Sequence, residues 1–145
     1  MTRHTDAYAP DPAPEAPRPP RPSRPAVVEL AAAILIVGGV IGLFGALTAA
    51  PRLPAGAEPL LFLTIVLDVG AIVCGVLIRT GRAWVVAVNY VAVLAFLDLL
   101  AAASSPLALM IGVGNLAAVV IVLWHKSWFD AVGRWRAGDD ADLTP

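Results

Sequence analysis

The candidates for chemistry in this chain are polar side chains that interrupt long apolar stretches. Asp68 lies near the middle of the nineteen residues 60–78, LLFLTIVLDVGAIVCGVLI. An aspartate at the centre of a membrane helix costs about 2.5–3.5 kcal/mol on insertion scales, so its side chain is expected to face protein rather than lipid. The other intramembrane polar candidates are Thr64, Asn89, Asp98 and Asn115.

Asp68 is expected to be a neutral acid that forms a hydrogen bond. No Lys, Arg or His lies within an apolar stretch, and desolvation without a counter-ion favours the uncharged carboxyl group. Counted from the centres of the stretches, Asn115 lies at the depth of Asp68 and is its predicted partner, whereas Asp98 lies about 7 Å nearer the outer face. Two interpretations stay open: a proton- or cation-linked site, or polar contact that holds helices together.

The remaining sequence gives no support for catalysis. Asn89 and Asp98 are nine residues apart, which places them on opposite sides of a helix and argues against a single polar pathway. Both histidines lie outside the apolar stretches, and the sequence has no phosphate-binding loop, HExxH motif or nucleophile elbow. The single cysteine, Cys74, excludes CxxC chemistry. We therefore expect a protein that is not an enzyme, with no cofactor and no metal site.

The elements that must position these residues are four transmembrane helices. A helix of nineteen residues spans about 28 Å, close to the hydrocarbon thickness of a bilayer. Hydrophobic residues make up 59% of the chain and charged residues 14%, unlike an ordinary soluble protein. We predict an all-α fold, a transmembrane four-helix bundle over residues 27–125 in a lipid bilayer, with no nucleic-acid partner. Its spans are residues 27–50, 60–78, 83–103 and 107–124.

The connections between the spans carry turn residues. Gly81 is expected to end the second helix in the left-handed conformation. The run Ser104-Ser105-Pro106 supplies an N-cap and a proline at the first helical position of the fourth helix. Because this connection is so short, the third and fourth helices are expected to be antiparallel neighbours.

Small residues are expected to set the helix packing. In lipid, the close approach of two backbones supplies packing that a hydrophobic effect cannot supply. Gly38 and Gly42 form a GxxxG motif and share a helix face with Gly45, and Gly75 is the packing candidate in residues 60–78. We expect this face of the first helix to meet another helix of the same chain, with a second protomer as the alternative.

Residues 1–26 form a proline- and arginine-rich tail. This tail holds eight of the thirteen prolines and little to bury, so it is predicted to be disordered with polyproline II character. Its overlapping PxxP spacings and arginines would suit an SH3-like domain or an anionic lipid surface. The alternative is a soluble leader whose arginines fix the orientation of the protein.

The cations predict the topology. Nine of the ten Lys and Arg residues fall on the side of both termini, and Arg52 is alone on the other side. This bias predicts a multi-pass protein of the plasma membrane with both termini in the cytoplasm. The predicted interfacial anchors fall on the same side and are all tryptophans: Trp84, Trp124, Trp128 and Trp135.

Residues 126–145 are predicted to form a cytoplasmic amphipathic helix followed by an acidic end. Ser127 and Asp130 have the spacing of a capping box. Tryptophans recur at helical spacing on one face, which is typical of a helix lying in the membrane interface. A docking helix for a partner protein is the alternative.

The overall pattern resembles small four-span integral membrane proteins of the actinobacterial type. The resemblance rests on the proline- and arginine-rich tail, the four spans, the sequence GRAW at residues 81–84 and the basic, Trp-bearing segment after the fourth span. It implies no activity. The small multidrug transporters also have four short spans, but their carboxylate lies deep in the first span, whereas Glu29 is peripheral.

The function expected from these features is that of a small, non-enzymatic interaction or regulatory membrane protein. Such a protein would act as a homo-oligomer or with a membrane protein partner. The alternative is a proton- or cation-linked transporter or channel subunit that must oligomerise to form a pathway.

Overall fold

The computed structural model describes residues 20–103 and 105–138. In these residues the regular structure is helical: α1 (Ala26–Ala49), the short 3-10 helix η1 (Ala50–Arg52), α2 (Glu58–Thr80), α3 (Trp84–Ala101), α4 (Pro106–Trp124) and α5 (Lys126–Ala137). Helices α1 to α4 are long and apolar enough to cross a membrane. The predicted all-α fold with four spans is confirmed. The predicted disorder of residues 1–19 and the acidic end at residues 139–145 lie outside the described residues.

The helix ends follow from local sequence. Gly81 ends α2 with a φ of 68°, in the left-handed region that favours glycine. Ser105 caps α4, because its Oγ accepts a hydrogen bond of 3.3 Å from the backbone N–H of Ala108. Pro106 occupies the first position of α4, where no backbone N–H is needed. These turns were expected from the sequence and are confirmed.

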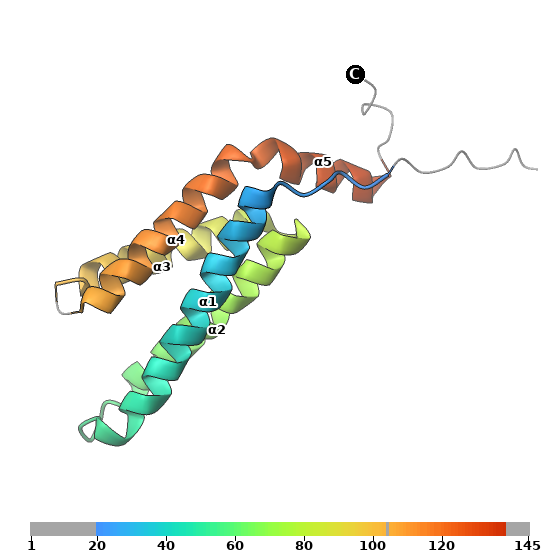
Figure 1. Ribbon diagram of the computed structural model, residues 1–145. Helices are drawn as coiled ribbons and strands as arrows, with labels where there is room; N and C mark the ends of the chain where they lie inside the picture. Colours follow the sequence, from blue (N-terminus) through green and yellow to red (C-terminus); the bar gives the residue numbers. More distant parts are fainter. Residues whose placement is uncertain (1–19, 104, 139–145) are drawn as a thin grey trace, which may run out of the picture.

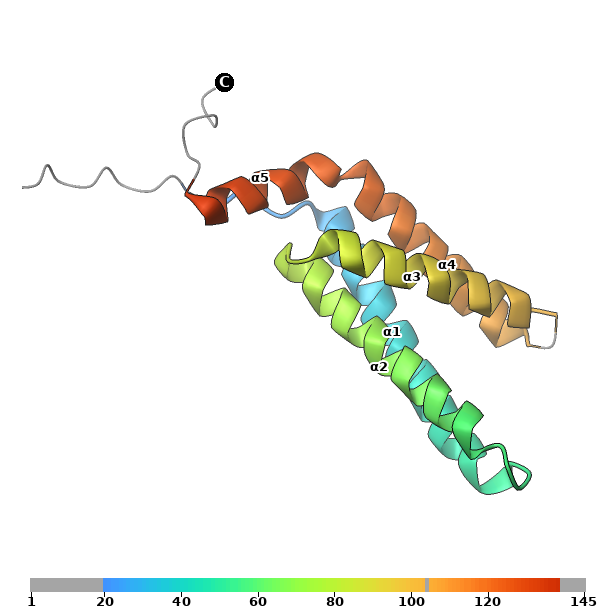
Figure 2. The ribbon, with the colours of Figure 1, turned by 180° about the vertical axis from the view of Figure 1, so that it is seen from behind.

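The four spans are arranged as two antiparallel hairpins that diverge. Helix α1 packs mainly on α2, and α3 packs mainly on α4. Both views show the hairpins meeting near α5 and separating toward the opposite end of the molecule (Figures 1 and 2). The bundle is therefore closed at the end that holds α5 and open at the other end.

The buried core lies at the closed end. It is built from the start of α1, the end of α2, the start of α3, the end of α4 and one face of α5. Its largest fully buried side chains are Phe129, Leu35, Ile78, Val28, Val91, Val122 and Val132. Many large apolar side chains elsewhere on the four spans are exposed, as expected for surfaces that face lipid.

Glycines bring α1 against α2, but the contact is not centred on the predicted face. A Cβ at Gly39 would lie 2.7 Å from the carbonyl oxygen of Asp68, and a Cβ at Gly75 would lie 2.9 Å from that of Ala32. Gly42 is also closely packed on α2, whereas Gly45 has no neighbour within 4 Å. The predicted face of Gly38, Gly42 and Gly45 does not form as a unit, because α1 is rotated so that Gly39 faces α2.

Helix α5 docks on the closed end of the bundle. Phe129 is 1% exposed, and its ring lies 5.6 Å from the ring of Trp84 between centroids. Trp128 packs edge-to-face on Phe129 at 4.8 Å. The amphipathic helix was predicted, but the capping box at Ser127 is wrong. Helix α5 begins at Lys126 directly after α4, so residue 127 already lies within the helix and caps nothing.

Candidate functional site

An intramembrane polar pair joins α3 to α4. Asn115 is 2% exposed, and its Nδ2 atom donates a hydrogen bond of 2.9 Å to Oδ2 of Asp98. Gly112, one turn away on α4, makes this possible, because a Cβ there would lie 3.0 Å from the Cβ of Asp98. The two backbones therefore approach closely at the level of the carboxylate.

The predicted pairing of Asn115 with Asp68 is wrong, and the reason lies in the direction of the side chains. Side chains on a helix lean toward its N-terminus. Because α3 and α4 are antiparallel, Asp98 leans toward the closed end and Asn115 leans toward the open end. A count of residues along straight helices places Asp98 and Asn115 at different depths in the membrane. Because their side chains lean toward each other, they nevertheless meet.

Asp68 lies instead at the contact between α1 and α2. A Cβ at Gly42 would lie 2.7 Å from Cγ of Asp68 and 2.9 Å from its Oδ2, so the carboxyl group fills the space that the glycine leaves. Asp68 is half-buried, and its Oδ2 atom is buried with no hydrogen-bond partner among the described residues. The carboxyl group of Asp68 therefore retains hydrogen-bonding capacity inside the protein.

Tyr90 makes a polar contact that was not predicted from the sequence. Its hydroxyl group donates a hydrogen bond of 3.0 Å to the carbonyl oxygen of Leu67, which ties α3 to α2 one residue from Asp68. Gly70 provides room for the ring, because a Cβ there would lie 2.9 Å from Cε1 of Tyr90. The sequence feature that could have indicated this contact is the phenol group of Tyr90 within an apolar stretch.

The other two polar candidates do not join this group. The hydroxyl of Thr64 donates to the carbonyl oxygen of Leu60 at 2.9 Å, and the amide of Asn89 donates to that of Val85 at 2.8 Å. Both bonds stay within one helix, and both side chains lie at exposed positions. The structure thus brings Asp98 and Asn115 together, places Asp68 beside α1, and leaves Thr64 and Asn89 on the surface.

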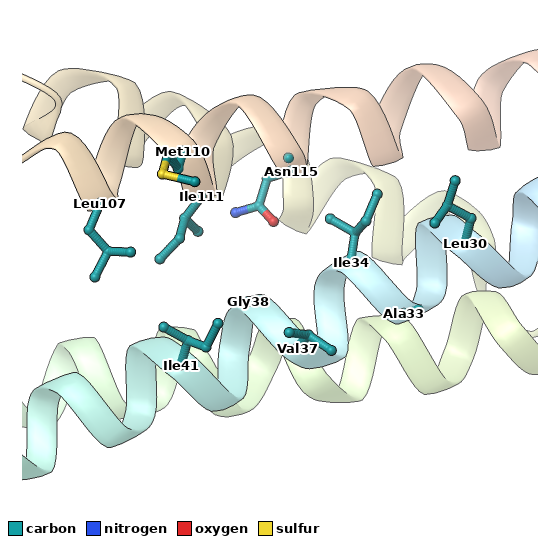
Figure 3. Close-up of a pocket in the computed structure, with 11 residues that line it drawn as sticks. Leu30, Ala33, Ile34, Val37, Gly38, Ile41, Leu107, Met110, Ile111 and Asn115 are labelled. Carbon is teal, nitrogen blue, oxygen red and sulfur yellow. The ribbon is translucent and has the colours of Figure 1, made fainter.

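An apolar groove with a volume of about 400 Å³ lies between α1 and α4, where the hairpins diverge. Ile34 of α1 and Ile111 of α4 point across it toward the opposite helix (Figure 3). Asn115 is the polar member of its lining. The groove residues are Leu30, Ala33, Ile34, Val37, Gly38, Ile41, Leu107, Met110, Ile111, Gly114 and Asn115.

Cationic side chains gather at the closed end of the bundle. Glu29, at the start of α1, forms ion pairs with Arg24 and, at 2.7 Å, with Arg79 at the end of α2. Arg136 of α5 donates to the carbonyl oxygens of Thr80 and, at 3.1 Å, of Gly81. These contacts connect three segments: the chain before α1, the turn after α2, and α5. The three segments therefore form one continuous surface.

The four tryptophans at this end have different surroundings. Trp84 and Trp128 pack in the protein core, and Trp128 is 8% exposed. Trp124 is 83% exposed, and Trp135 lies beneath the guanidinium of Arg21 at 5.9 Å. Trp124 is therefore the tryptophan of the four that is most available to lipid.

Comparison of the chain with protein-family models, with curated proteins and with solved structures gives no match. The four apolar helices indicate a multi-pass membrane protein.

Proposed function

We propose that this chain is a small, non-enzymatic interaction or regulatory protein of the plasma membrane, with both termini in the cytoplasm. The supporting observation is the apolar groove between α1 and α4, which would receive a transmembrane helix of a second chain. Ala33, Gly38 and Gly114 lie in its lining, and small residues allow the close backbone approach by which helices associate in lipid. The groove is long because it follows α1 from Leu30 to Ile41 and α4 from Leu107 to Asn115.

Site-specific crosslinking in membranes tests this proposal. A photoreactive residue would replace Val37 or Met110, which line the groove and are 56% and 73% exposed, or Phe62 of α2 as a control that is 69% exposed outside it. We expect crosslinks to protein from both groove positions and not from residue 62. The mass of the product separates a second copy from a different partner. Crosslinks to lipid alone, or equal crosslinking at residue 62, would exclude a protein-binding groove.

We propose as a second candidate a proton- or cation-linked transporter or channel subunit that acts as an oligomer. The observation that favours it is the buried, unpartnered Oδ2 of Asp68, since a carboxyl group with free hydrogen-bonding capacity can exchange a proton. Its test is pH-dependent flux in liposomes with Asp68→Asn, because an amide keeps the shape of the side chain but cannot titrate. Undiminished flux in this variant would exclude the candidate, and Asn89→Ala is the control.

A further inference from the structure

A second cavity lies at the closed end of the bundle, where the chain before α1 passes α5. It has a volume of about 160 Å³ and is lined by Arg21, Pro22, Arg24 and Trp128. One water molecule requires about 15 Å³ by the same kind of measure, so the cavity can hold a group considerably larger than water. The cavity is separate from the apolar groove and from the intramembrane polar residues.

Trp128, which lines this cavity, carries an unsatisfied donor. Trp128 is 8% exposed, and its Nε1–H is buried with no hydrogen-bond partner among the described residues. The Cη2 and Cζ3 atoms of the ring pack on Gly81, which occupies the edge of the indole that does not carry the nitrogen. A buried N–H without a partner costs free energy that a bound acceptor would recover.

The charge around the cavity selects an anion. The guanidinium of Arg21 also donates to the carbonyl oxygen of Thr80 at 3.2 Å, which fixes its position near the end of α2. Arg24 is paired with Glu29, but this one carboxylate is shared with Arg79. Burial, then the nearby charges of Arg82 and Arg21, lower the pKa of Arg136, as expected where like charges gather. A bound anion would relieve this repulsion.

We propose that this cavity binds the phosphate group of an anionic phospholipid, with the guanidinium groups of Arg21 and Arg24 as donors. The indole N–H of Trp128 is buried in this structure and becomes a third donor when the ring turns toward the bound phosphate. Phosphate oxygens accept hydrogen bonds from arginine in favourable geometry. The lipid is favoured over free phosphate by position, because Arg24 lies two residues before the first membrane span and therefore at the depth of the headgroups. The cavity shares no lining residue with the apolar groove, so lipid binding here can be tested independently of the proposed function.

The first test is a binding titration of the full chain in detergent. Short-chain phosphatidylglycerol is compared with phosphatidylcholine of the same chain length and with inorganic phosphate. We expect saturable binding of one phosphatidylglycerol per chain, at least tenfold tighter than either alternative. Equal binding of phosphatidylcholine would overturn a charge-selective site. Binding of inorganic phosphate as tight as that of the lipid would overturn the assignment to a lipid headgroup.

Three variants separate a built site from general attraction to a positive surface. Trp128→Phe keeps an aromatic ring but removes the N–H, and we expect about tenfold weaker binding, the effect of one hydrogen bond to a charged group. Arg21→Gln should weaken binding by at least as much. Arg134→Gln makes the same change of charge at an exposed position of α5 that does not line the cavity, and it should change binding less than twofold. Equal losses for the two arginine variants would overturn the proposal.

A spectroscopic readout keeps the test valid if Trp128→Phe alters folding. With ¹⁵N-labelled tryptophan, the spectrum of the full chain should contain an indole signal for each of the four tryptophans. The signal of Trp128, assigned by elimination with Trp84→Phe, Trp124→Phe and Trp135→Phe, should move on titration with phosphatidylglycerol and stay in place with phosphatidylcholine. The signal of exposed Trp124 serves as the internal control. An unmoved Trp128 signal at saturating phosphatidylglycerol would overturn the proposal.

Discussion

The side chain of Asn115 donates a 2.9 Å hydrogen bond to the carboxylate of Asp98 across the α3–α4 hairpin. The bond lies beside Gly112, where the two helices approach most closely at this level. Such bonds between membrane helices stabilise by about 0.6 kcal/mol on average and by about 1.7 kcal/mol at most. This pair therefore holds α3 and α4 together, and Asp68 does not take part in its hydrogen bond.

Replacing Asn115 by alanine should destabilise the protein modestly, by about 0.6–1.7 kcal/mol, because the half-buried carboxyl group of Asp98 loses its donor. The control is Asn89→Ala, which removes an amide bonded only within its own helix and should be nearly silent. Reversible unfolding in mixed micelles gives both values. A double-mutant cycle with Asp98→Ala should return a coupling energy of the same size, and a zero coupling energy would mean that the bond contributes nothing.

Gly42→Ala should destabilise the α1–α2 hairpin, because the added methyl group meets the carboxyl group of Asp68. Gly45→Ala is the matched control, since a Cβ there has no neighbour within 4 Å and alanine favours helix over glycine by about 1 kcal/mol. Thermal denaturation in detergent measures both. Adding Asp68→Ala to the Gly42→Ala variant should restore stability, and failure of this rescue would place the clash elsewhere.

Phe129→Ala should cost on the order of 3–5 kcal/mol and release α5 from the bundle, because the ring is fully buried against Trp84. Limited proteolysis should then cleave residues 126–137 in the variant and spare them in the parent chain. Trp124→Ala removes a larger but mostly exposed side chain and should leave α5 protected. Equal protection of α5 in both variants would show that α5 is held by other contacts.

Reporter fusions after residues 56 and 140 should report opposite sides of the membrane, with residue 140 in the cytoplasm. Three apolar helices, α2, α3 and α4, lie between the two positions. The cations at the closed end supply the physical reason for the orientation, because Lys and Arg are retained on the cytoplasmic side. Replacing Arg79 and Arg82 together by glutamine reduces the excess of cations on this side, and a smaller fraction of the chains should then adopt the predicted orientation. Reports from the same side would require an even number of crossings between the two positions.

The number and limits of the helices could be read from the sequence, because the cost of placing polar groups in lipid acts on each segment separately. Pro106 begins α4 and Gly81 ends α2 through their own backbone preferences, and the structure places both as expected. The amphipathic pattern of residues 126–137 likewise identified α5 from local periodicity.

The partners of the polar side chains could not be read in this way. A rotation of one residue along α1 exchanges Gly38 for Gly39 at the contact with α2, and both patterns suit a helix equally well. Asp68 and Asn115 share a depth in the sequence, yet they lie on helices of different hairpins, and the antiparallel lean of the side chains gives Asn115 to Asp98. Only the tertiary structure decided these contacts, because they depend on helix rotation, tilt and the divergence of the hairpins, which no single segment encodes.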